Sequence, residues 1–170
     1  SNEQSDLVWD HEDVLDLDDF TVQEIETVIA LAEQMREVLD RRIARAPALR
    51  GFTVINLFFE PSTRTRASFE LAGKVLGADV ISVSADNSSV VKGESLIDTV
   101  KTLSAMRADA IVMRHSMSGA PYLASTYTDA AIINAGDGSH AHPTQALLDI
   151  YTLKQRLGSL RGKKIVMVGD

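Results

Sequence analysis

Apolar residues first recur along this chain at the spacing of an amphipathic helix. The pattern runs from Thr21 to Arg45 and predicts a helix over that stretch. Thr21 and Glu24 have the spacing of a capping box, in which each side chain accepts a hydrogen bond from the other residue's backbone N–H. Pro47 and Gly51 follow and close the element. The apolar face of this helix would consist of Ile25, Val28, Ile29, Ala32, Met35 and Leu39.

Four short apolar runs come next along the chain. A run of four to eight apolar residues bounded by turn-forming residues is typical of a buried strand. The expected strands cover residues 52–59, 80–83, 110–113 and 131–134. After the last of them, Gly136-Asp137-Gly138 is predicted to form a turn.

Each apolar run is followed by residues at helical spacing. The expected helices cover about 61–76, begin near Leu96, cover about 121–127 and begin at Pro143, a residue suited to the first helical position. Gly77 would end the first of them. Strands that alternate with helices predict an α/β fold with a parallel sheet of about four strands and helices on both faces.

The chain has 170 residues, enough for one domain with a good core and a short remainder. We expect residues 1–150 to form that domain and 151–162 to complete a connecting helix and linker. The segment KKIVMVGD, residues 163–170, has the pattern of a new strand. It would be the first strand of a second domain that is otherwise missing from this chain.

Composition excludes several classes of protein. Hydrophobic residues make up 45% and charged residues 24%, which is ordinary for a globular protein, and no apolar run approaches the roughly 20 residues of a membrane span. The first residues are polar and acidic, unlike a signal peptide. The absence of cysteine is consistent with a cytoplasmic protein. The net charge of −7 argues against nucleic-acid binding, and it means that any small anion must be held by local donors.

The stretch richest in polar chemistry is FFEPSTRTRASFE, from Phe58 to Glu70. It joins the first expected strand to the start of a helix, where unpaired N–H groups and the positive end of the dipole favour an anion. Hydroxyl and guanidinium groups add donors suited to phosphate oxygens. A helix cap with surface arginines is the alternative, and Arg66 fits a structural ion pair equally well. The pattern predicts a site for a phosphorylated small molecule, formed by Ser62, Thr63, Arg64 and Thr65.

Two further segments reach the same edge of the expected sheet, because ligands of open parallel sheets bind beyond the carboxyl ends of the strands. In Ser88–Thr99, Lys92 at a helix start can add a positive charge to a phosphate site, or it can be a solvated loop residue. Arg114 directly follows a strand, where an arginine has no use in the core, and this favours a function. His115 beside it is expected to point elsewhere.

The last segment of this group is Asn134–Asp149. It places His142 directly before Pro143 and puts Gln145 on the first helical turn, so that an imidazole and an amide can reach one pocket. His140 and His142 also have the His-x-His spacing of a metal site. Since neither a cysteine nor an obvious third ligand accompanies them, we expect no metal.

Together these segments resemble the carbamoyltransferases, and most closely bacterial aspartate carbamoyltransferase catalytic chains. FFEPSTRTR, KGES, MRH and HPTQALLD occur here in the family's order, and the resemblance extends to the VGD at 168–170. It implies the family's N-terminal, carbamoyl-phosphate-binding domain. Ornithine carbamoyltransferases share STRTR but typically have a lysine before it, an arginine in place of the lysine of KGE, and a cysteine in HPCQ. Pro61, Lys92 and Thr144 occupy those places here and favour the aspartate enzyme.

The resemblance also implies a reaction and a role for each matching residue. The carbamoyl group would pass from carbamoyl phosphate to the α-amino group of L-aspartate, giving N-carbamoyl-L-aspartate and phosphate on the route to pyrimidines. Ser62, Thr63, Arg64 and Thr65 would hold the phosphate. Thr65, Arg114 and His142 would surround the carbonyl oxygen, and Gln145 would bind the carbamoyl NH₂. The residues expected to act in catalysis are Arg64, Thr65, Arg114 and His142.

Partners follow from the same resemblance. Ser88 and Lys92 match a loop that family members insert into the active site of the neighbouring subunit of a homotrimer, and regulatory or dihydroorotase subunits are further partners within the family. No metal or organic cofactor is implied. Two alternatives stay open, namely an ornithine carbamoyltransferase and a non-catalytic domain that binds a phosphate-bearing ligand.

Two positions bear on how the site would work in this chain. Ser116 stands where the family usually has the proline of RHP. Glu60 would normally face the second domain, which in the family binds the aspartate carboxylates. Without that domain, we expect the chain alone to be nearly inactive.

Overall fold

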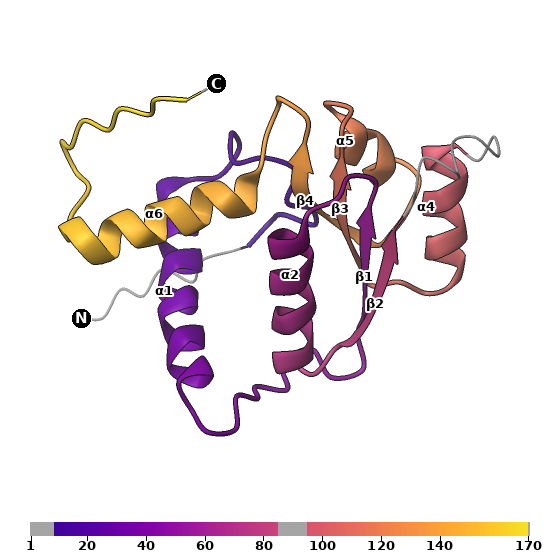
Figure 1. Ribbon diagram of the computed structural model, residues 1–170, viewed down its shortest axis with the longest axis horizontal. Helices are drawn as coiled ribbons and strands as arrows, with labels where there is room; N and C mark the ends of the chain where they lie inside the picture. Colours follow the sequence, from indigo (N-terminus) through magenta and orange to yellow (C-terminus); the bar gives the residue numbers. More distant parts are fainter. Residues whose placement is uncertain (1–8, 85–94, 170) are drawn as a thin grey trace.

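The fold is built around one parallel sheet, seen in a computed structural model that describes residues 9–84 and 95–169 (Figure 1). The four strands lie in the order β2-β1-β3-β4, and all neighbouring pairs are parallel. The strands are β1 Thr53–Phe58, β2 Asp79–Ser84, β3 Ala110–His115 and β4 Ala131–Asp137. The helices are α1 Val22–Leu39, α2 Thr63–Val75, α4 Leu96–Ala105, α5 Ala120–Ser125 and α6 Pro143–Leu157. The predicted α/β fold is confirmed.

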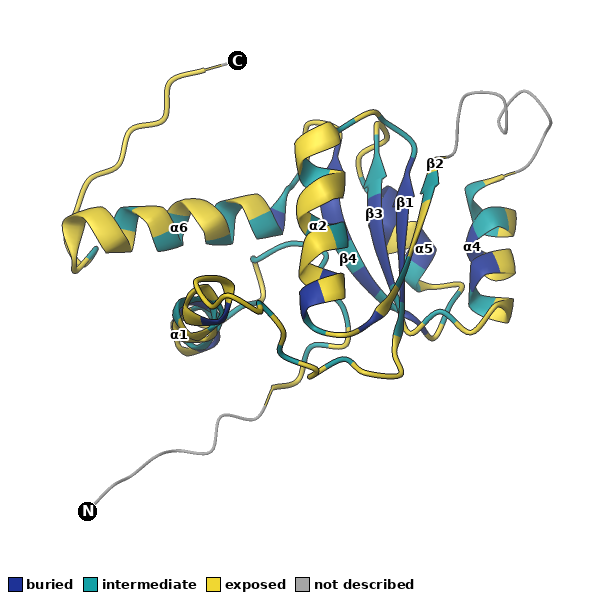
Figure 2. Cartoon of the chain, turned by 60° about the horizontal axis from the view of Figure 1, so that its bottom comes forward, coloured by how far each residue is buried: buried dark blue, intermediate teal, exposed yellow. Residues whose placement is uncertain are grey.

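Helices cover both faces of the sheet, as Figure 2 shows by the dark blue of β1 and β3 between them, while the edge strand β2 is largely exposed. On one face, Ile55 and Leu57 of β1 belong to a cluster of buried side chains that includes Val100 of α4. On the other face, Val54 and Phe58 pack in a cluster on the side of α2. Alternate residues of a strand point to opposite faces, so one apolar strand contributes to two cores.

The amino-terminal segment runs beside the sheet before α1 begins. Val14 forms an isolated parallel bridge with Ile133, and its N–H donates to the Ile132 carbonyl at 2.8 Å. The predicted capping box at the start of α1 is present, with Thr21 and Glu24 bonding each other's backbone N–H groups. Within the described residues, no helix has both the length and the apolarity needed to cross a membrane.

Several predicted element bounds are wrong. Strand β3 continues through Arg114 and His115, which had been expected to follow it. Three further differences have a physical reason. Helix α1 ends at Leu39 rather than Arg45, because the chain turns so that the Ala46 N–H can donate to the Val75 carbonyl. Strand β4 continues through Gly136 and Asp137, which had been expected in a turn. Residues 163–169 form no strand, since a strand requires a paired neighbour and this segment is exposed. The division into domains stays a prediction.

Candidate functional site

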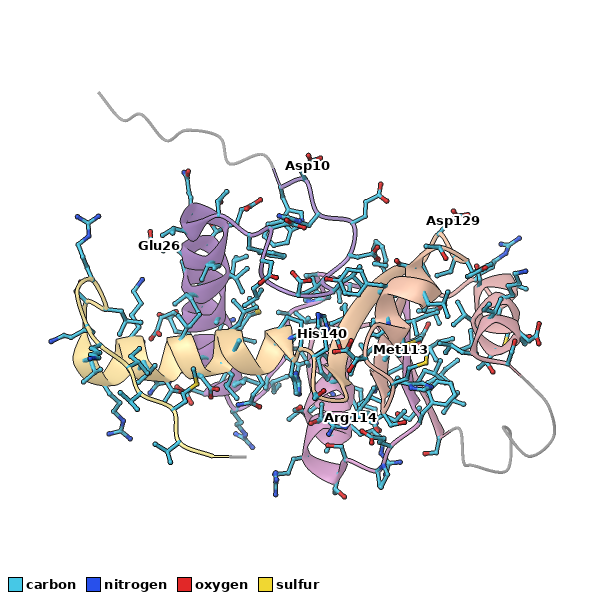
Figure 3. The ribbon with its side chains drawn as sticks, turned by 90° about the horizontal axis from the view of Figure 1, so that it is seen from above. Asp10, Glu26, Met113, Arg114, Asp129 and His140 are labelled. Carbon is cyan, nitrogen blue, oxygen red and sulfur yellow. The ribbon has the colours of Figure 1, made fainter. Side chains whose placement is uncertain are left out.

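The polar segments of interest meet at the carboxyl edge of the sheet. Strands β1 and β3 are neighbours, with Phe58 opposite Arg114 in the register. The Phe59 N–H donates to the Arg114 carbonyl at 2.9 Å, so the loop into α2 begins directly beside Arg114. Figure 3 looks down on this edge, where Arg114 and His140 lie between the strands and the start of α6. Three of the four segments expected at this edge, those of Ser62–Thr65, Arg114 and Asn134–Asp149, are found here, while Ser88 and Lys92 of the fourth lie outside the described residues.

The start of α2 has the features of an anion site. Ser62 is the N-cap residue, but its hydroxyl makes no capping hydrogen bond, and the first turn carries no acidic residue. Arg64 is exposed, and among the described residues its guanidinium has no hydrogen-bond or ion-pair partner. Free N–H groups, a free hydroxyl and a free cation at a helix start are suited to bind phosphate oxygens.

Arg66, two residues further along, is used differently. Its Nη1 donates to Ser84 Oγ at 3.1 Å, which links α2 to the end of the edge strand β2. Of the two roles left open for Arg66, this contact favours the structural one, although the partner is a hydroxyl rather than the carboxylate of an ion pair. The two arginines of the motif thus offer a matched pair for experiment.

Arg114 is held at the end of β3 by backbone and side-chain contacts. Its Nη1 donates to the Ala135 carbonyl at 3.0 Å, and its Nε lies 3.7 Å from Glu60 Oε2. The Nε atom is buried without a hydrogen-bond partner among the described residues. Glu60, which the resemblance assigned to contacts with another domain, instead faces Arg114. This pairing leaves part of the guanidinium available to a ligand.

Gly136 separates Arg114 from His142. A Cβ atom at Gly136 would lie 2.6 Å from Arg114 Nη1 and 3.5 Å from His142 Cδ2. Its φ of +114° is also a conformation that residues with a Cβ rarely adopt. The absence of a side chain at this position lets the guanidinium and the imidazole lie close together.

His142 is the N-cap residue of α6, and Pro143 takes the first helical position as predicted. Its Nδ1 lies 3.3 Å from Thr144 Oγ1. Burial and the nearby positive charge of Arg114 lower the pKa of His142 below the ordinary 6.5, while Asp149 opposes the shift. The imidazole is therefore neutral at pH 7 and can donate one hydrogen bond without carrying charge.

This pKa shift predicts a loss of stability in mild acid. As pH falls below 6.5, the unfolded chain takes up a proton that folded His142 resists, so the free energy of unfolding decreases until the lower folded pKa is passed. Burial lowers the pKa of His115 in the same direction. Each histidine contributes a slope of at most about 1.4 kcal/mol per pH unit. In urea titrations at pH 5, 6 and 7, His142→Gln should flatten this dependence, and an unchanged slope would contradict the assignment.

A groove of about 270 Å³ lies between α2 and α6. It brings together Thr65, His142 and Gln145, three residues predicted for the carbamoyl side of the site. Gln145 is also engaged along its own helix, where its amide donates to Asp149 Oδ1 at 3.0 Å. The complete lining consists of Thr65, Ser68, Phe69, Ala72, His142, Thr144, Gln145 and Leu148.

Other predicted residues do not line this groove, and some fall outside the residues that the structure describes. Ser62, Thr63 and Arg64 stand at the start of α2 rather than in the groove lining. Ser88 and Lys92 fall in residues 85–94 and lie outside the described residues. Their expected contribution to a neighbouring subunit stays a prediction.

The remaining histidines have structural partners. His140 Nδ1 lies 2.9 Å from Asp137 Oδ2. His115 Nδ1 accepts the Met117 N–H at 2.9 Å, and its ring packs 4.6 Å from that of Phe59, consistent with no part in the site. Among the residues that the structure describes, no three His, Cys, Asp or Glu side chains are grouped as a metal site would require.

Sequence reasoning missed the buried polar residues of β4. Asn134 and Asp137 are fully buried, and they bond each other at 3.0 Å. The signal was present, since two polar residues interrupt an apolar run directly before the segment with His142. Reading Gly136-Asp137-Gly138 as a turn concealed it, because a turn places polar residues in solvent.

A larger hollow of about 870 Å³ lies at the opposite edge of the sheet, among residues that precede β3 and β4. It includes Lys101, Asp109 and Asp129 but none of the residues predicted for the site. Asp109 accepts the Thr53 N–H at 2.7 Å and so has a structural use. Because parallel sheets bind ligands at the carboxyl edge, the smaller groove with convergent polar groups is the better candidate.

Residues 12–155 match the family model described as aspartate/ornithine carbamoyltransferase, carbamoyl-P binding domain. This chain belongs to that family. The match covers the whole sheet and every predicted site residue, from Ser62 to Gln145. The sequence-based resemblance to carbamoyltransferases is confirmed.

Similar proteins of known name support the same placement. The aspartate carbamoyltransferase catalytic subunit of Roseiflexus sp. (strain RS-1) is 64% identical over 157 residues, which cover 92% of this chain and 49% of that protein. That of Dehalococcoides mccartyi (strain CBDB1) is 54% identical over 162 residues, 95% of this chain and 49% of that protein. The chain therefore spans about half the length of the curated relatives it matches.

Solved structures agree in fold. The aspartate transcarbamoylase of Trypanosoma cruzi in complex with carbamoyl phosphate has a TM-score of 0.81 and 38% identity, over 88% of this chain and 46% of that chain. The catalytic subunit of M. jannaschii aspartate transcarbamoylase has a TM-score of 0.80 and 44% identity, over 89% of this chain and 49% of that chain. The sheet and helices described above are therefore those of a carbamoyl-phosphate-binding domain.

Proposed function

We propose that this chain carries the carbamoyl-phosphate half of a transferase site. The carbamoyl group would pass from carbamoyl phosphate to the α-amino group of L-aspartate, yielding N-carbamoyl-L-aspartate and phosphate. The observation that carries the proposal is Arg64 at the start of α2, which has no partner in residues 9–84 and 95–169 and stands beside the groove that holds Thr65, His142 and Gln145. Family membership and a T. cruzi relative solved with carbamoyl phosphate and aspartate support it.

The phosphate would bind at the start of α2. Ser62, Thr63, Arg64 and Thr65 supply hydroxyl, backbone and guanidinium donors within one helical turn. When the C–O bond to phosphate breaks, negative charge collects on the leaving phosphate oxygens. Donors already in place stabilise this charge more in the transition state than in the ground state.

The carbamoyl group would face Arg114, His142 and Gln145. The amine nitrogen attacks the carbonyl carbon, a C–N bond forms, and charge develops on the carbonyl oxygen before phosphate leaves and the nitrogen loses a proton. Arg114 and a neutral His142 can each donate to that oxygen, while Gln145 binds the carbamoyl NH₂. Loss of one such donor typically raises the barrier by about 3–4 kcal/mol. No metal or organic cofactor enters this scheme.

Aspartate is the acceptor favoured over ornithine. Pro61, Lys92 and Thr144 point that way, and both curated relatives quoted above are named for aspartate. We propose further that the protein acts in the cytoplasm as a homotrimer in which Ser88 and Lys92 serve a neighbouring subunit. Regulatory or dihydroorotase subunits are additional candidate partners.

Arg64→Ala tests the phosphate site. Since hydrogen bonds to charged groups contribute about 1.5–3 kcal/mol, the variant should bind carbamoyl phosphate and inorganic phosphate about 10- to 100-fold more weakly than the wild type. Its folding should be unchanged, because Arg64 is exposed and has no partner among the described residues. Isothermal titration calorimetry and thermal shift on the chain would measure both quantities.

Arg66→Ala is the matched control. It removes the same side chain two positions along the same helix, where the guanidinium bonds Ser84 instead of a ligand. It should retain binding while losing a little stability. The assignment of the phosphate site fails if wild-type chain gives no thermal shift with carbamoyl phosphate, or if the two variants bind it equally well. L-Aspartate alone should produce little shift in any of them.

A further inference from the structure

The carboxylate of Asp137, next to the proposed site, has four hydrogen-bond partners. It is fully buried at the end of β4. Oδ1 accepts from Asn134 Nδ2 at 3.0 Å and from the Ala141 N–H at 2.9 Å, while Oδ2 accepts from the Gly119 N–H at 2.8 Å. His140 Nδ1 lies 2.9 Å from Oδ2. The loop after β4 is therefore closed around one negative charge.

These bonds keep that charge in place at neutral pH. Burial by itself would raise the pKa of Asp137, but the hydrogen bonds from Asn134, Gly119, Ala141 and His140 outweigh it and hold the pKa below the ordinary 3.8. A buried carboxylate is costly unless its oxygens are satisfied, and here both are. The loop can therefore relax only by breaking bonds to an ion, which makes it stiff.

One arm of this network reaches His142. Ala141, whose N–H is bound by the carboxylate, directly precedes His142, and the Ala141 carbonyl accepts the Asp137 N–H at 3.1 Å. The backbone of Ala141 is thus fixed on both sides by Asp137. The direction in which the His142 side chain leaves the N-cap of α6 depends on that anchor.

The other arm reaches Arg114. Asn134 uses its amide nitrogen for Asp137 and for the Leu15 carbonyl at 2.9 Å, and its oxygen accepts the Gly136 N–H at 2.8 Å. That bond fixes the peptide after Ala135, whose carbonyl receives Arg114 Nη1 at 3.0 Å. The guanidinium of Arg114 therefore donates to a peptide group whose orientation is fixed by its hydrogen bond to Asn134.

We propose that Asp137, together with Asn134, is a positioning residue that holds His142 and Arg114 where they meet the carbamoyl group. This rests on the proposed function for the identity of the ligand. Neither side chain contacts the ligand in this proposal. Asp137 acts through the backbone of Ala141, and Asn134 acts through the peptide after Ala135. The phosphate donors at the start of α2 belong to a different element, and none of the bonds described above connects them to Asp137.

The test uses the fact that the contacts leading to His142 and Arg114 are separate from the phosphate donors at the start of α2. Asp137→Asn keeps the size of the side chain but turns an NH₂ group toward backbone N–H donors. We expect carbamoyl phosphate to bind about tenfold or more weakly, since small misplacements of binding groups have effects of that order, and inorganic phosphate to lose less than about threefold. Asp13→Asn is the control, because Asp13 also accepts a β4 backbone N–H, that of Ile132 at 2.6 Å, but at the other end of the strand.

A second measurement tests the positions of His142 and Arg114 in the chain without ligand. In heteronuclear NMR spectra, Asp137→Asn should move the ring signals of His142 and the Nε–H signal of Arg114, and Asp13→Asn should leave both in place. If Asp137→Asn does not fold, Asn134→Ala carries the same expectations. Equal weakening of both ligands by Asp137→Asn, or unchanged His142 and Arg114 signals, overturns the positioning role. Failure of the wild type to bind carbamoyl phosphate would overturn only the proposed function, since the NMR comparison of the variants needs no ligand.

Discussion

Gly136→Ala is expected to lower the affinity for carbamoyl phosphate about a hundredfold while costing the fold only about 1–3 kcal/mol. The new Cβ would lie 2.6 Å from Arg114 Nη1. Nη1 is the end of a flexible side chain, so the overlap is relieved by moving the guanidinium and breaking its bond to Ala135. The remaining cost is backbone strain at a φ of +114°. Calorimetric titration and urea unfolding separate the two effects.

Gly51→Ala provides the comparison. Gly51 also has a positive φ, +88°, but a Cβ there would meet nothing within 4 Å. It precedes β1 at the edge of the sheet opposite the site. Gly51→Ala should lower the free energy of unfolding through backbone strain but leave the affinity for carbamoyl phosphate unchanged. If Gly136→Ala and Gly51→Ala bind carbamoyl phosphate equally, then contact with Arg114 is not what Gly136 provides.

Leu57→Ala is expected to destabilise the chain by about 2–5 kcal/mol, a large share of the roughly 5–15 kcal/mol typical of a domain. Leu57 is fully buried in the middle of the sheet, in the cluster that includes Ile111 and Met113. Truncation removes buried apolar surface and leaves a cavity that strands on both sides prevent from closing. Urea unfolding monitored by circular dichroism measures the change.

The exposed Leu71 of α2 gives the matched substitution. Leu71 is 57% exposed, so Leu71→Ala should change the free energy of unfolding by less than about 0.5 kcal/mol. Similar losses for the two leucines would mean that the core does not lie where the sheet places it. Leu57→Ala should also weaken ligand binding only in proportion to the unfolded fraction, because Leu57 does not line the groove.

Much of the fold follows from local pattern. The apolar runs that became β1, β3 and β4 stand out because buried parallel strands carry few polar residues, whereas β2 is a largely exposed edge strand. The start of α1 at Thr21 was readable because a capping box depends only on residues three apart. Its end was not, because the chain leaves the helix where Ala46 bonds Val75, a residue distant in the sequence.

The candidate site divides in the same way. The position of Ser62–Thr65 at the start of a helix could be predicted, and with it the proposal of an anion site, since unpaired N–H groups at a helix start are a local property. The neighbours of Arg114 could not. Glu60 and the Ala135 carbonyl lie next to Arg114 because β1, β3 and β4 are adjacent in the sheet. That strand order is set by the tertiary structure.

By itself, the sequence determined the sheet-and-helix alternation, the family and the identity of the residues that we propose as donors to phosphate. These depend on spacing and residue type, which are complete within each short segment. The tertiary structure decided which donors are free and which are committed. Among the described residues Arg64 has no hydrogen-bond or ion-pair partner, whereas Arg66 donates to Ser84, although the two have the same side chain on one helix. It also decided that Asp137 is a buried anchor rather than a turn residue, because burial and hydrogen-bond partners depend on what the other strands bring beside it.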